Sequence, residues 1–251
     1  MRIAVISDIH GNLPALEAVL DDIRLRSADL TVNLGDCCAS PLWPRETFEL
    51  LQSLGLPTVR GNHDRWMGER PRSALSRTLN YEYDQLLPQQ RAALGVLPAT
   101  LEFDHGSILA VHGTPASDET FLLEDRVDSR MHLSTPAQIK ARLGHVGAGL
   151  VLCGHSHTQQ LVHLPAGPVI VNPGSVGLPN YADGPDAPGA NARSPHARYA
   201  IVTRRANRWS ADLIALAYDW DRAARRALDN DRPEWARVYL TGSVLDPETL
   251  N

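Results

Sequence analysis

The sequence predicts an α/β (α+β) fold in which two mixed β-sheets pack as a sandwich flanked by helices. A strand-turn-helix pattern repeats through the N-terminal half of the chain. After about residue 99 the pattern changes to short apolar strands separated by turn residues. The length of 251 residues is enough to bury a full core, and we expect one domain over residues 1–251.

The N-terminal half alternates strands with helices. The β-branched run RIAVIS is typical of a buried strand, and apolar residues from Leu13 to Ile23 then recur at helical spacing. A second helix is closed by Gly55. The predicted elements are strands at 2–7, 30–34 and 56–60, and helices at 13–23, 44–54 and, with weak periodicity, 74–95.

The C-terminal half is richer in strands, and sequential strands that pair late in a chain are typical of packed sheets with helices outside. Strands are predicted at 100–104, 107–113, 150–154, 159–164, 168–174, 198–203 and 209–216, and helices at 136–143, 219–229 and 233–239. Residues 178–198 are rich in Gly, Pro and Ala and too polar for a core. They are predicted to form a surface loop, which is a candidate lid.

Composition narrows the classes of function. The chain has 24 basic and 29 acidic residues, a net charge of −5, and no block of like charges. A general nucleic-acid-binding protein would normally present a basic face, so we expect no stable nucleic-acid partner, although a nucleotide substrate remains allowed. The oligomeric state is left open.

Cysteine usage and hydropathy indicate the compartment. The three cysteines, Cys37, Cys38 and Cys153, are an odd number with two adjacent, which is a poor disulfide framework and fits a reducing compartment. All three are expected to be ordinary packing residues. The N-terminus does not resemble a secretion signal, and no apolar run approaches the roughly 20 residues needed to span a bilayer. We therefore expect a cytoplasmic protein without membrane attachment.

Polar side chains follow five of the predicted strands, at the point where each strand ends. In open α/β sheets ligands bind beyond the carboxyl ends of strands, so these residues should meet in one crevice. Oxygen from Asp and Asn with nitrogen from His suits Mn, Fe, Co, Ni or Zn rather than calcium. The residues are Asp8, His10, Asp36, Asn62, His63, Asp64, His112, His155 and His157.

This set is larger than one metal ion needs and is sufficient for two adjacent ions. A carboxylate is the natural bridge between two ions, and Asp36 follows Gly35, whose missing side chain would leave room for both metals. Two-metal hydrolytic centres hold ions roughly 3.5–4 Å apart and act on phosphoryl groups. The five remaining histidines lie outside any motif and are expected to be surface or structural residues.

Five motifs together resemble the calcineurin-like metallophosphoesterase superfamily, and in particular its small single-domain bacterial phosphodiesterases. The motifs are SDIHGN, GDC, GNHD, VHG and GHSH, within residues 3 to about 177. The resemblance implies a β-sandwich flanked by helices and a two-metal site. It implies that one metal is held by Asp8, His10 and His157, the other by Asn62, His112 and His155, with Asp36 bridging. It further implies that His63 faces the substrate phosphate while Asp64 holds the ring of His63.

The predicted activity is hydrolysis of phosphate diesters by a hydroxide that bridges two divalent ions, with manganese expected and Fe, Ni, Co or Zn as alternatives. A small phosphate ester or nucleotide is the expected substrate. A phosphomonoesterase, a protein phosphatase or a dinucleoside polyphosphate hydrolase on the same site remains an alternative. A non-catalytic scaffold module of the same fold is a more distant one, because relatives of that kind replace the substrate-facing histidine whereas GNHD is intact here. Weaker candidates for substrate contact are Asn172, Ser175, Arg65, Tyr181 and Arg193.

Overall fold

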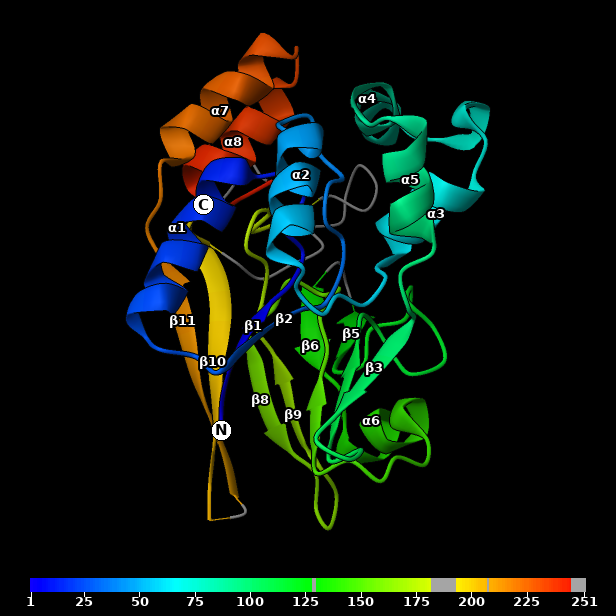
Figure 1. Cartoon of the computed structure of the whole chain (residues 1–251), viewed down its shortest axis with the longest axis vertical. Helices are drawn as coiled ribbons and strands as arrows, with labels where there is room; N and C mark the ends of the chain where they lie inside the picture. The colour runs from blue at the N-terminus through cyan, green and yellow to red at the C-terminus, as the bar shows by residue number, and fades with distance from the viewer. Residues whose placement is uncertain (128–129, 182–192, 207, 245–251) are drawn as a thin grey trace.

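Two sheets and the helices around them make up the computed structural model, which describes residues 1–127, 130–181, 193–206 and 208–244. The sheets occupy the lower half of Figure 1, and most of the helices gather above them. One sheet has four strands and the other has five, and each contains both parallel and antiparallel pairs. The predicted sandwich of two mixed sheets flanked by helices is confirmed.

The four-stranded sheet has the order β11-β10-β1-β2. Only β1 and β2 are parallel in it, with Ile3 opposite Leu30. The bounds are β1 Arg2–Ile6, β2 Leu30–Asn33, β10 Ala197–Arg205 and β11 Arg208–Leu216.

The five-stranded sheet has the order β3-β4-β7-β9-β8, with β4, β7 and β9 parallel at its centre. Its bounds are β3 Thr100–Phe103, β4 Ile108–Val111, β7 Leu150–Leu152, β8 Gln160–His163 and β9 Val169–Asn172. A separate two-stranded sheet of β5 (Glu124–Val127) and β6 (Arg130–Leu133) was not predicted. Each of its strands has only four residues, and β5 contains three charged residues and a single apolar one, which gives a weak sequence signal.

The core lies between the two sheets and on their outer faces. Successive side chains of a strand point to opposite faces, so Ile3 and Val5 of β1 enter the cluster shared by both sheets. Ala4 and Ile6 pack instead against α1. Because both faces of β1 are buried, the strand reads as a continuous apolar run rather than as an alternating one.

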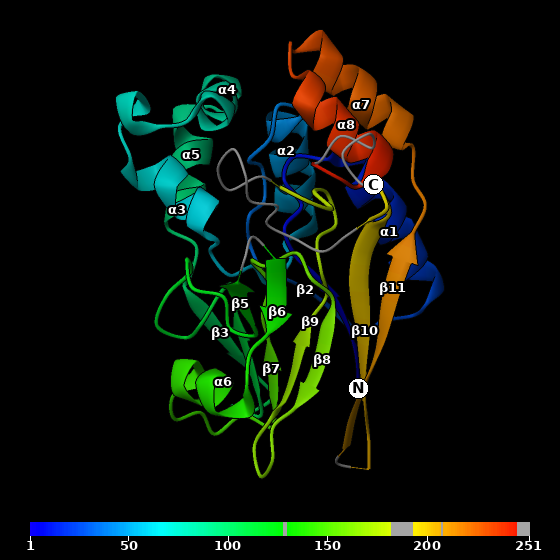
Figure 2. The same cartoon turned by 180° about the vertical axis from the view of Figure 1, so that it is seen from behind.

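Helices cover both sheets and the upper end of the molecule. Seen from behind, α3, α4 and α5 stand on one side of that end, α7 and α8 stand on the other, and α2 lies between them (Figure 2). The bounds are α1 Leu13–Leu25, α2 Pro44–Leu54, α3 Asn62–Glu69, the 3₁₀ turn η1 Arg72–Ala74, α4 Arg77–Gln85, α5 Pro88–Gly95, α6 Pro136–Leu143, α7 Trp220–Asp229 and α8 Pro233–Thr241.

The predicted third strand is wrong in extent. Of residues 56–60 only Thr58 makes a bridge, to Asn33. Pro57 has no N–H for a ladder, and the N–H of Arg60 donates to the carbonyl of Pro98 at 2.7 Å. The weakly periodic stretch 74–95 is divided between the end of η1 and two short helices, because Pro88 starts a new helix.

The start of the predicted surface loop at 178–198 belongs to the core. Leu178 and Asn180 are each 4% exposed. Leu178 packs in a cluster with α7 and α8, and the Asn180 side chain donates to the carbonyl of Gly242. Residues 182–192 lie outside the described part of the chain, so the lid stays a prediction.

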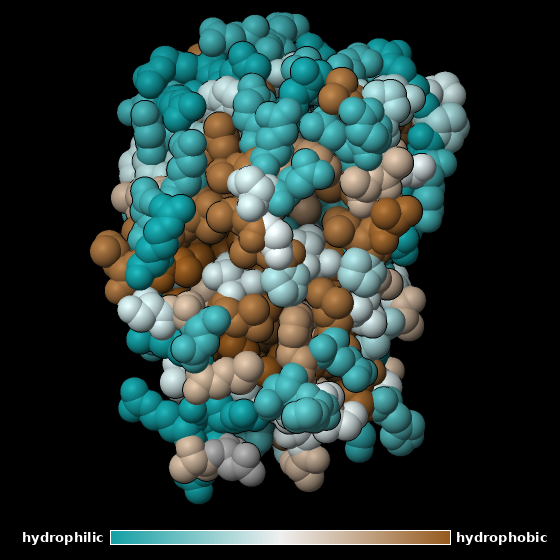
Figure 3. All heavy atoms as spheres, in the orientation of Figure 1, coloured by the Kyte–Doolittle hydropathy of each residue, from teal (hydrophilic) through white to brown (hydrophobic). Residues whose placement is uncertain are grey.

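The outer surface carries polar and apolar residues in different places. On the face in Figure 3 the helical upper end is mainly hydrophilic, and hydrophobic side chains gather across the middle of the molecule.

Within the described residues, every helix is too short or too polar to cross a membrane. The three cysteines are buried and unpaired, as their predicted packing role requires.

Candidate functional site

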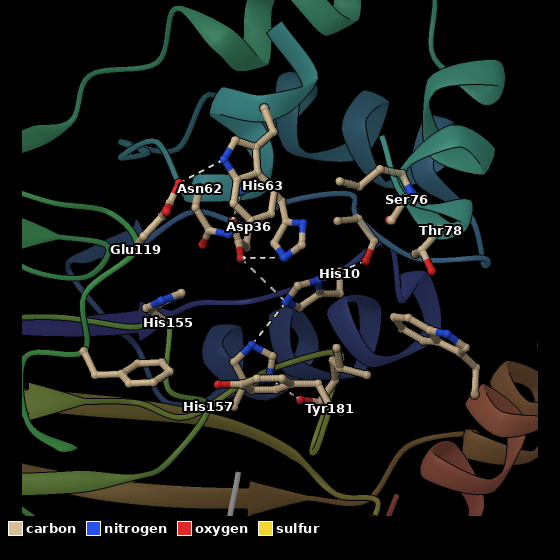
Figure 4. Close-up of a pocket in the computed structure, with 16 residues that line it drawn as sticks. His10, Asp36, Asn62, His63, Ser76, Thr78, Glu119, His155, His157 and Tyr181 are labelled. Carbon is tan, nitrogen blue, oxygen red and sulfur yellow. Dashed lines mark hydrogen bonds and ion pairs between the residues drawn. The ribbon is translucent and has the colours of Figure 1, made fainter. Parts of the chain in front are cut away.

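The loops that follow four strands bring their polar residues together, and α3 adds two more. In Figure 4 the labelled histidines of three of these segments surround Asp36. Asp8 and His10 follow β1, Asp36 follows β2, His112 follows β4, His155 and His157 follow β7, and Asn62 and His63 begin α3. Residues that are far apart in the chain, from Asp8 to His157, therefore share one place in the fold.

Left-handed backbone conformations aim these side chains inward. Five non-glycine residues of the set have positive φ angles: Asp8 54°, His10 47°, Asp36 54°, His155 68° and His157 56°. This conformation costs an L-residue roughly 1–2 kcal/mol, and such strain persists where surrounding structure holds it, often at functional sites. It turns the chain just beyond each strand, so that His155 and His157 take part in separate groups of ligand atoms.

Hydrogen bonds between the first two loops hold this conformation. The N–H of Asp8 donates to the carbonyl of Gly35 at 2.9 Å, and that of His10 donates to the carbonyl of Asp36 at 3.0 Å. Gly35 has φ +96°, and a Cβ on it would lie 2.4 Å from the nitrogen of Gly61. Gly35 is therefore required by its conformation and its close approach to Gly61. That it also leaves room for metals stays a prediction.

The first group of potential metal ligands is Asp8, His10 and His157, all buried. The Nε2 atoms of the two histidines are 3.2 Å apart. Asp8 Oδ1 lies 3.3 Å from Nε2 of His157 and 4.0 Å from that of His10, and it has no hydrogen-bond partner among the described residues. A buried carboxylate oxygen without a donor is costly unless a cation satisfies it.

Backbone carbonyls set the orientation of the rings. Nδ1 of His10 is 3.0 Å from the carbonyl of Ala39, and Nδ1 of His157 is 2.6 Å from that of Leu178. A carbonyl only accepts, so each Nδ1 carries the hydrogen and each neutral ring turns its Nε2 lone pair into the cluster. His112 is oriented in the same way by the carbonyl of Leu34, at 2.7 Å. Converging lone pairs of this kind fit a bound cation.

The second group is Asp36, His112 and His155. Nε2 of His112 lies 3.1 Å from Asn62 Oδ1, which adds an amide oxygen to the group. Asp36 Oδ2 is 3.5 Å from Nε2 of His112 and 3.9 Å from that of His10. Asp36 therefore lies between the two groups.

The electrostatics of the cluster hold most of its side chains in the protonation state that can bind a metal ion. Burial lowers the pKa of His10 to about 3 and that of His155 to about 4, which keeps both rings neutral. Burial alone would raise the pKa of Asp8, but the interaction of Asp8 with the neighbouring His157 outweighs it and holds that pKa at about 2. Burial opposes ionisation of Asp36 too, yet His112 and His63 hold its pKa well below the usual range. In the absence of metal, Asp36 outweighs burial at His112 and raises the pKa of that ring to about 10.

Asp64 does not hold the ring of His63, which corrects that expectation. Its Oδ2 accepts from the N–H of Asp36 at 2.8 Å and of Gly61 at 2.9 Å, and its Oδ1 accepts from the N–H of Cys37 at 3.0 Å. A carboxylate at the start of α3 is drawn to these backbone donors, which it satisfies together. Asp64 therefore positions the backbone of Asp36.

His63 lies at the edge of the cluster and is 30% exposed. Its Nε2 is 3.8 Å from Asp36 Oδ2, and its ring makes edge contacts with His10 and Trp66 at centroid distances of 5.5 Å and 4.9 Å. Burial lowers its pKa. His63 is thus the histidine of the motifs that belongs to neither ligand group, and it faces a cavity.

The cavity has a volume of about 420 Å³, within the range of small-molecule sites. Besides the site residues, it is lined by side chains that no motif indicated, from α3, α4, α8 and the loop after β4. These include Trp66, Ser76, Thr78, Glu119, Phe121 and Trp235. A tryptophan on an amphipathic helix is usually a core residue, so the sequence held no usable signal for Trp235.

The weaker candidates for substrate contact lie in different parts of the structure, and not all of them reach the cavity. Asn172 and Ser175 are 1% and 0% exposed. The Asn172 amide donates to the carbonyl of Gly154 at 2.8 Å, and the Ser175 hydroxyl donates to that of Asp8 at 2.7 Å, so both brace the loops. Arg65 pairs with Asp118 and Glu119, Tyr181 lines the cavity, and Arg193 is exposed.

Known proteins resemble the chain over nearly its full length. It is 28% identical to an uncharacterized protein of Methanocaldococcus jannaschii, with 95% of this chain and 97% of that protein aligned. A metallophosphoesterase from Sphaerobacter thermophilus is 25% identical with a TM-score of 0.69, covering 98% of this chain and 100% of that one. A hypothetical protein from Pyrococcus horikoshii has a TM-score of 0.74 at 21% identity, covering 96% and 98%, and shows the fold alone.

A family model adds the decisive comparison. The model described as "Calcineurin-like phosphoesterase superfamily domain" matches residues 1–189, which carry every motif named above. The family uses divalent metals and supports phosphoric ester hydrolysis as the activity, and the two ligand groups are candidate metal-binding groups. The chain belongs to the calcineurin-like phosphoesterase superfamily.

Proposed function

We propose that this protein is a two-metal phosphodiesterase, with Asp8, His10 and His157 holding one divalent ion, Asn62, His112 and His155 the other, and Asp36 bridging them. The observation that carries the proposal is the position of Asp36 Oδ2, 3.9 Å from His10 and 3.5 Å from His112, between two groups of converging ligand atoms. The N/O donor set suits manganese, which is the proposed metal.

When bound, the two ions would lower the pKa of water toward neutrality and hold the attacking and leaving oxygens of a phosphoryl displacement. The protein's own residues would position the metal ligands and stabilise the substrate. Asp64 fixes the backbone of Asp36 through three N–H groups. His63, outside both ligand groups, is placed to donate a hydrogen bond or a proton to an oxygen of the substrate.

The charge of the cavity supports a diester over a monoester. Among the lining residues that the structure describes there is no lysine or arginine. A monoester phosphate is largely a dianion at neutral pH and is usually met by additional cationic side chains, whereas a diester is a monoanion. Within the cavity the metals would supply the positive charge, which suits the monoanion better.

The test combines metal content with substrate preference. After manganese loading, elemental analysis should find about two ions per chain. Hydrolysis of bis(p-nitrophenyl) phosphate and p-nitrophenyl phosphate is then compared with Mn, Co, Ni and Zn, and the diester should have the higher kcat/KM. The exposed His145, which lies outside every motif, provides a control as His145→Ala. Zero bound metal would contradict the ligand assignment, and a faster monoester would contradict the diesterase assignment alone.

A further inference from the structure

The cavity has two ends of different chemistry. One end holds the imidazole and carboxylate groups of the site, and the other is formed by Ser76 and Thr78 at the start of α4 and by Trp235 of α8. In Figure 4 Ser76 and Thr78 lie on the opposite side of the histidines from Glu119. The family match ends at residue 189, so Trp235 comes from a part of the chain that the match does not cover.

Aromatic and apolar side chains also line the cavity that contains the two ends. The ring of Tyr181 makes an edge contact with that of His157, with centroids 4.6 Å apart. Tyr181 and Trp235 both pack against the cluster that contains Leu42 and Leu178. Trp235 is only half-buried there and also lines the cavity. A ligand whose phosphate lies at the histidines can therefore extend along these side chains to the indole.

Hydrogen bonds between α4 and the start of α8 set the position of the indole. Nη2 of Arg232 donates to Thr78 Oγ1 at 2.8 Å, and Nη2 of Arg77 donates to the carbonyl and the carboxylate of Asp231 at 3.0 Å and 2.9 Å. Arg232 is 7% exposed, pairs with Glu234 at 2.5 Å and does not line the cavity. Its charge therefore supports the wall rather than a ligand.

The described lining of the far end lacks cationic side chains. This disfavours polyphosphate substrates and favours a ligand that ends in a neutral planar group. The described lining includes no lysine or arginine, and residues 182–192 contain none in sequence. The additional phosphates of a polyphosphate would meet no cationic side chain in the described lining. The nearby Arg232, whose guanidinium lies 5.5 Å from the centroid of the Trp235 ring, is buried and paired with Glu234. A neutral planar group matches better, because a nucleobase gains from stacking on an exposed aromatic face. The hydroxyls of Ser76 and Thr78 offer hydrogen bonds to the polar edge of such a group.

We propose that Trp235 is a specificity residue that stacks on the nucleobase of the substrate, so that the preferred substrate is a nucleoside ester with a single phosphate. This inference rests on the proposed phosphodiesterase function and names the substrate class of the same site. The hydroxyls of Ser76 and Thr78 lie beside the base or its ribose.

The test compares two diesters that release the same nitrophenolate. One is the p-nitrophenyl ester of thymidine 5′-monophosphate, and the other is ethyl p-nitrophenyl phosphate. The manganese-loaded wild-type protein should prefer the thymidine ester in kcat/KM. Trp235→Ala should lower that preference roughly tenfold, the size typical of losing one stacked base. Because the preference is a ratio within one protein sample, partial unfolding of the variant does not change it.

Two variants serve as controls. Trp235→Phe retains an aromatic face and should keep most of the preference. Leu240→Ala changes a residue of the same helix that is 47% exposed and absent from the cavity lining, so it should leave the preference unchanged. A second readout, independent of turnover, is calorimetric binding of thymidine 5′-monophosphate and ethyl phosphate. Trp235→Ala should weaken the nucleotide roughly tenfold more than ethyl phosphate.

The outcomes separate this inference from the proposed function. Equal hydrolysis of both diesters by the wild-type protein, or a preference that Trp235→Ala leaves intact, overturns the role of Trp235 while diesterase activity stands. If neither diester is hydrolysed but nucleotide binding depends on Trp235, the diesterase proposal fails and the nucleobase site stands.

Discussion

The histidine end of the cavity and its far end are built from different kinds of structure. The histidine end comes from strand-end loops in left-handed conformations, joined to one another by backbone hydrogen bonds. The far end comes from side chains on α4 and α8, whose positions depend on arginine side chains between the helices. Backbone hydrogen bonds hold ligand atoms with little freedom, whereas helix surfaces can change residue by residue without disturbing those loops.

The comparison implies a division of roles. Substitutions at the histidine end should change metal binding and the chemical step, and substitutions on the helical side should change stability or substrate choice alone. The variants below test that division.

Asp36→Asn should have the largest effect, because an amide keeps the shape but loses the charge needed between the two ligand groups. We expect activity below detection and disturbed binding of both metals, measured by elemental analysis and diester hydrolysis. Two tightly bound ions with near-normal turnover would show that Asp36 is not a bridge.

His63→Ala should retain two metals while kcat falls roughly 10²–10⁴-fold, the range for losing a positioned acid or base. Nitrophenolate leaves without a proton and a ribose alkoxide does not, so a general acid should matter more for nucleotide substrates with an alkoxide leaving group. Equal losses on both types of substrate would assign His63 to charge stabilisation instead. Loss of metal would make His63 a ligand.

Asp64→Ala should act through Asp36, because the carboxylate accepts three backbone N–H groups and none from the ring of His63. Metal affinity should fall about 10–100-fold, as when a residue that supports a ligand is removed. Calorimetric titration with manganese checks this. Unchanged metal affinity with a loss of kcat equal to that of His63→Ala would show instead that Asp64 holds the ring of His63.

Glu82→Gln, on α4, should have the smallest effect on function. Glu82 is fully buried, neither of its carboxyl oxygens has a hydrogen-bond partner among the described residues, and burial raises its pKa well above 4.5. Above pH 4.5 the unfolded chain releases this proton while the folded protein keeps it, so the free energy of unfolding falls as pH rises. Glutamine has no such proton.

Denaturant titrations at about pH 5 and about pH 8 measure this difference. The stability of Glu82→Gln relative to the wild-type protein should rise by up to about 1.4 kcal/mol per pH unit until the folded-state pKa is reached. Metal content and kcat should not change. A relative stability that is the same at both pH values would show that the carboxyl group is not held protonated, and a loss of metal would break the proposed division between the two ends.

The sequence by itself determined much of the histidine end. Apolar runs that end in Asp, Asn or His predict polar residues beyond strand ends, because the apolar character of a strand and its loss at the strand end are both local properties. The same local reasoning predicted the sandwich class. It missed the β5–β6 pair, extended a strand over residues 56–60, and assigned Leu178 and Asn180 to a surface loop, because burial of short segments depends on distant partners.

Tertiary structure alone decided which donors each side chain meets and what forms the far end of the cavity. The sequence around Asp64 contains only one of its backbone partners, the N–H of Gly61 three residues earlier, yet folding brings the N–H groups of Asp36 and Cys37, 28 and 27 residues away, to its oxygens. Trp235 lines the cavity because α8 is joined to α4 through Arg232 and Thr78, which are 154 residues apart. Contacts over such separations depend on how whole elements pack, and no local pattern of residues encodes them.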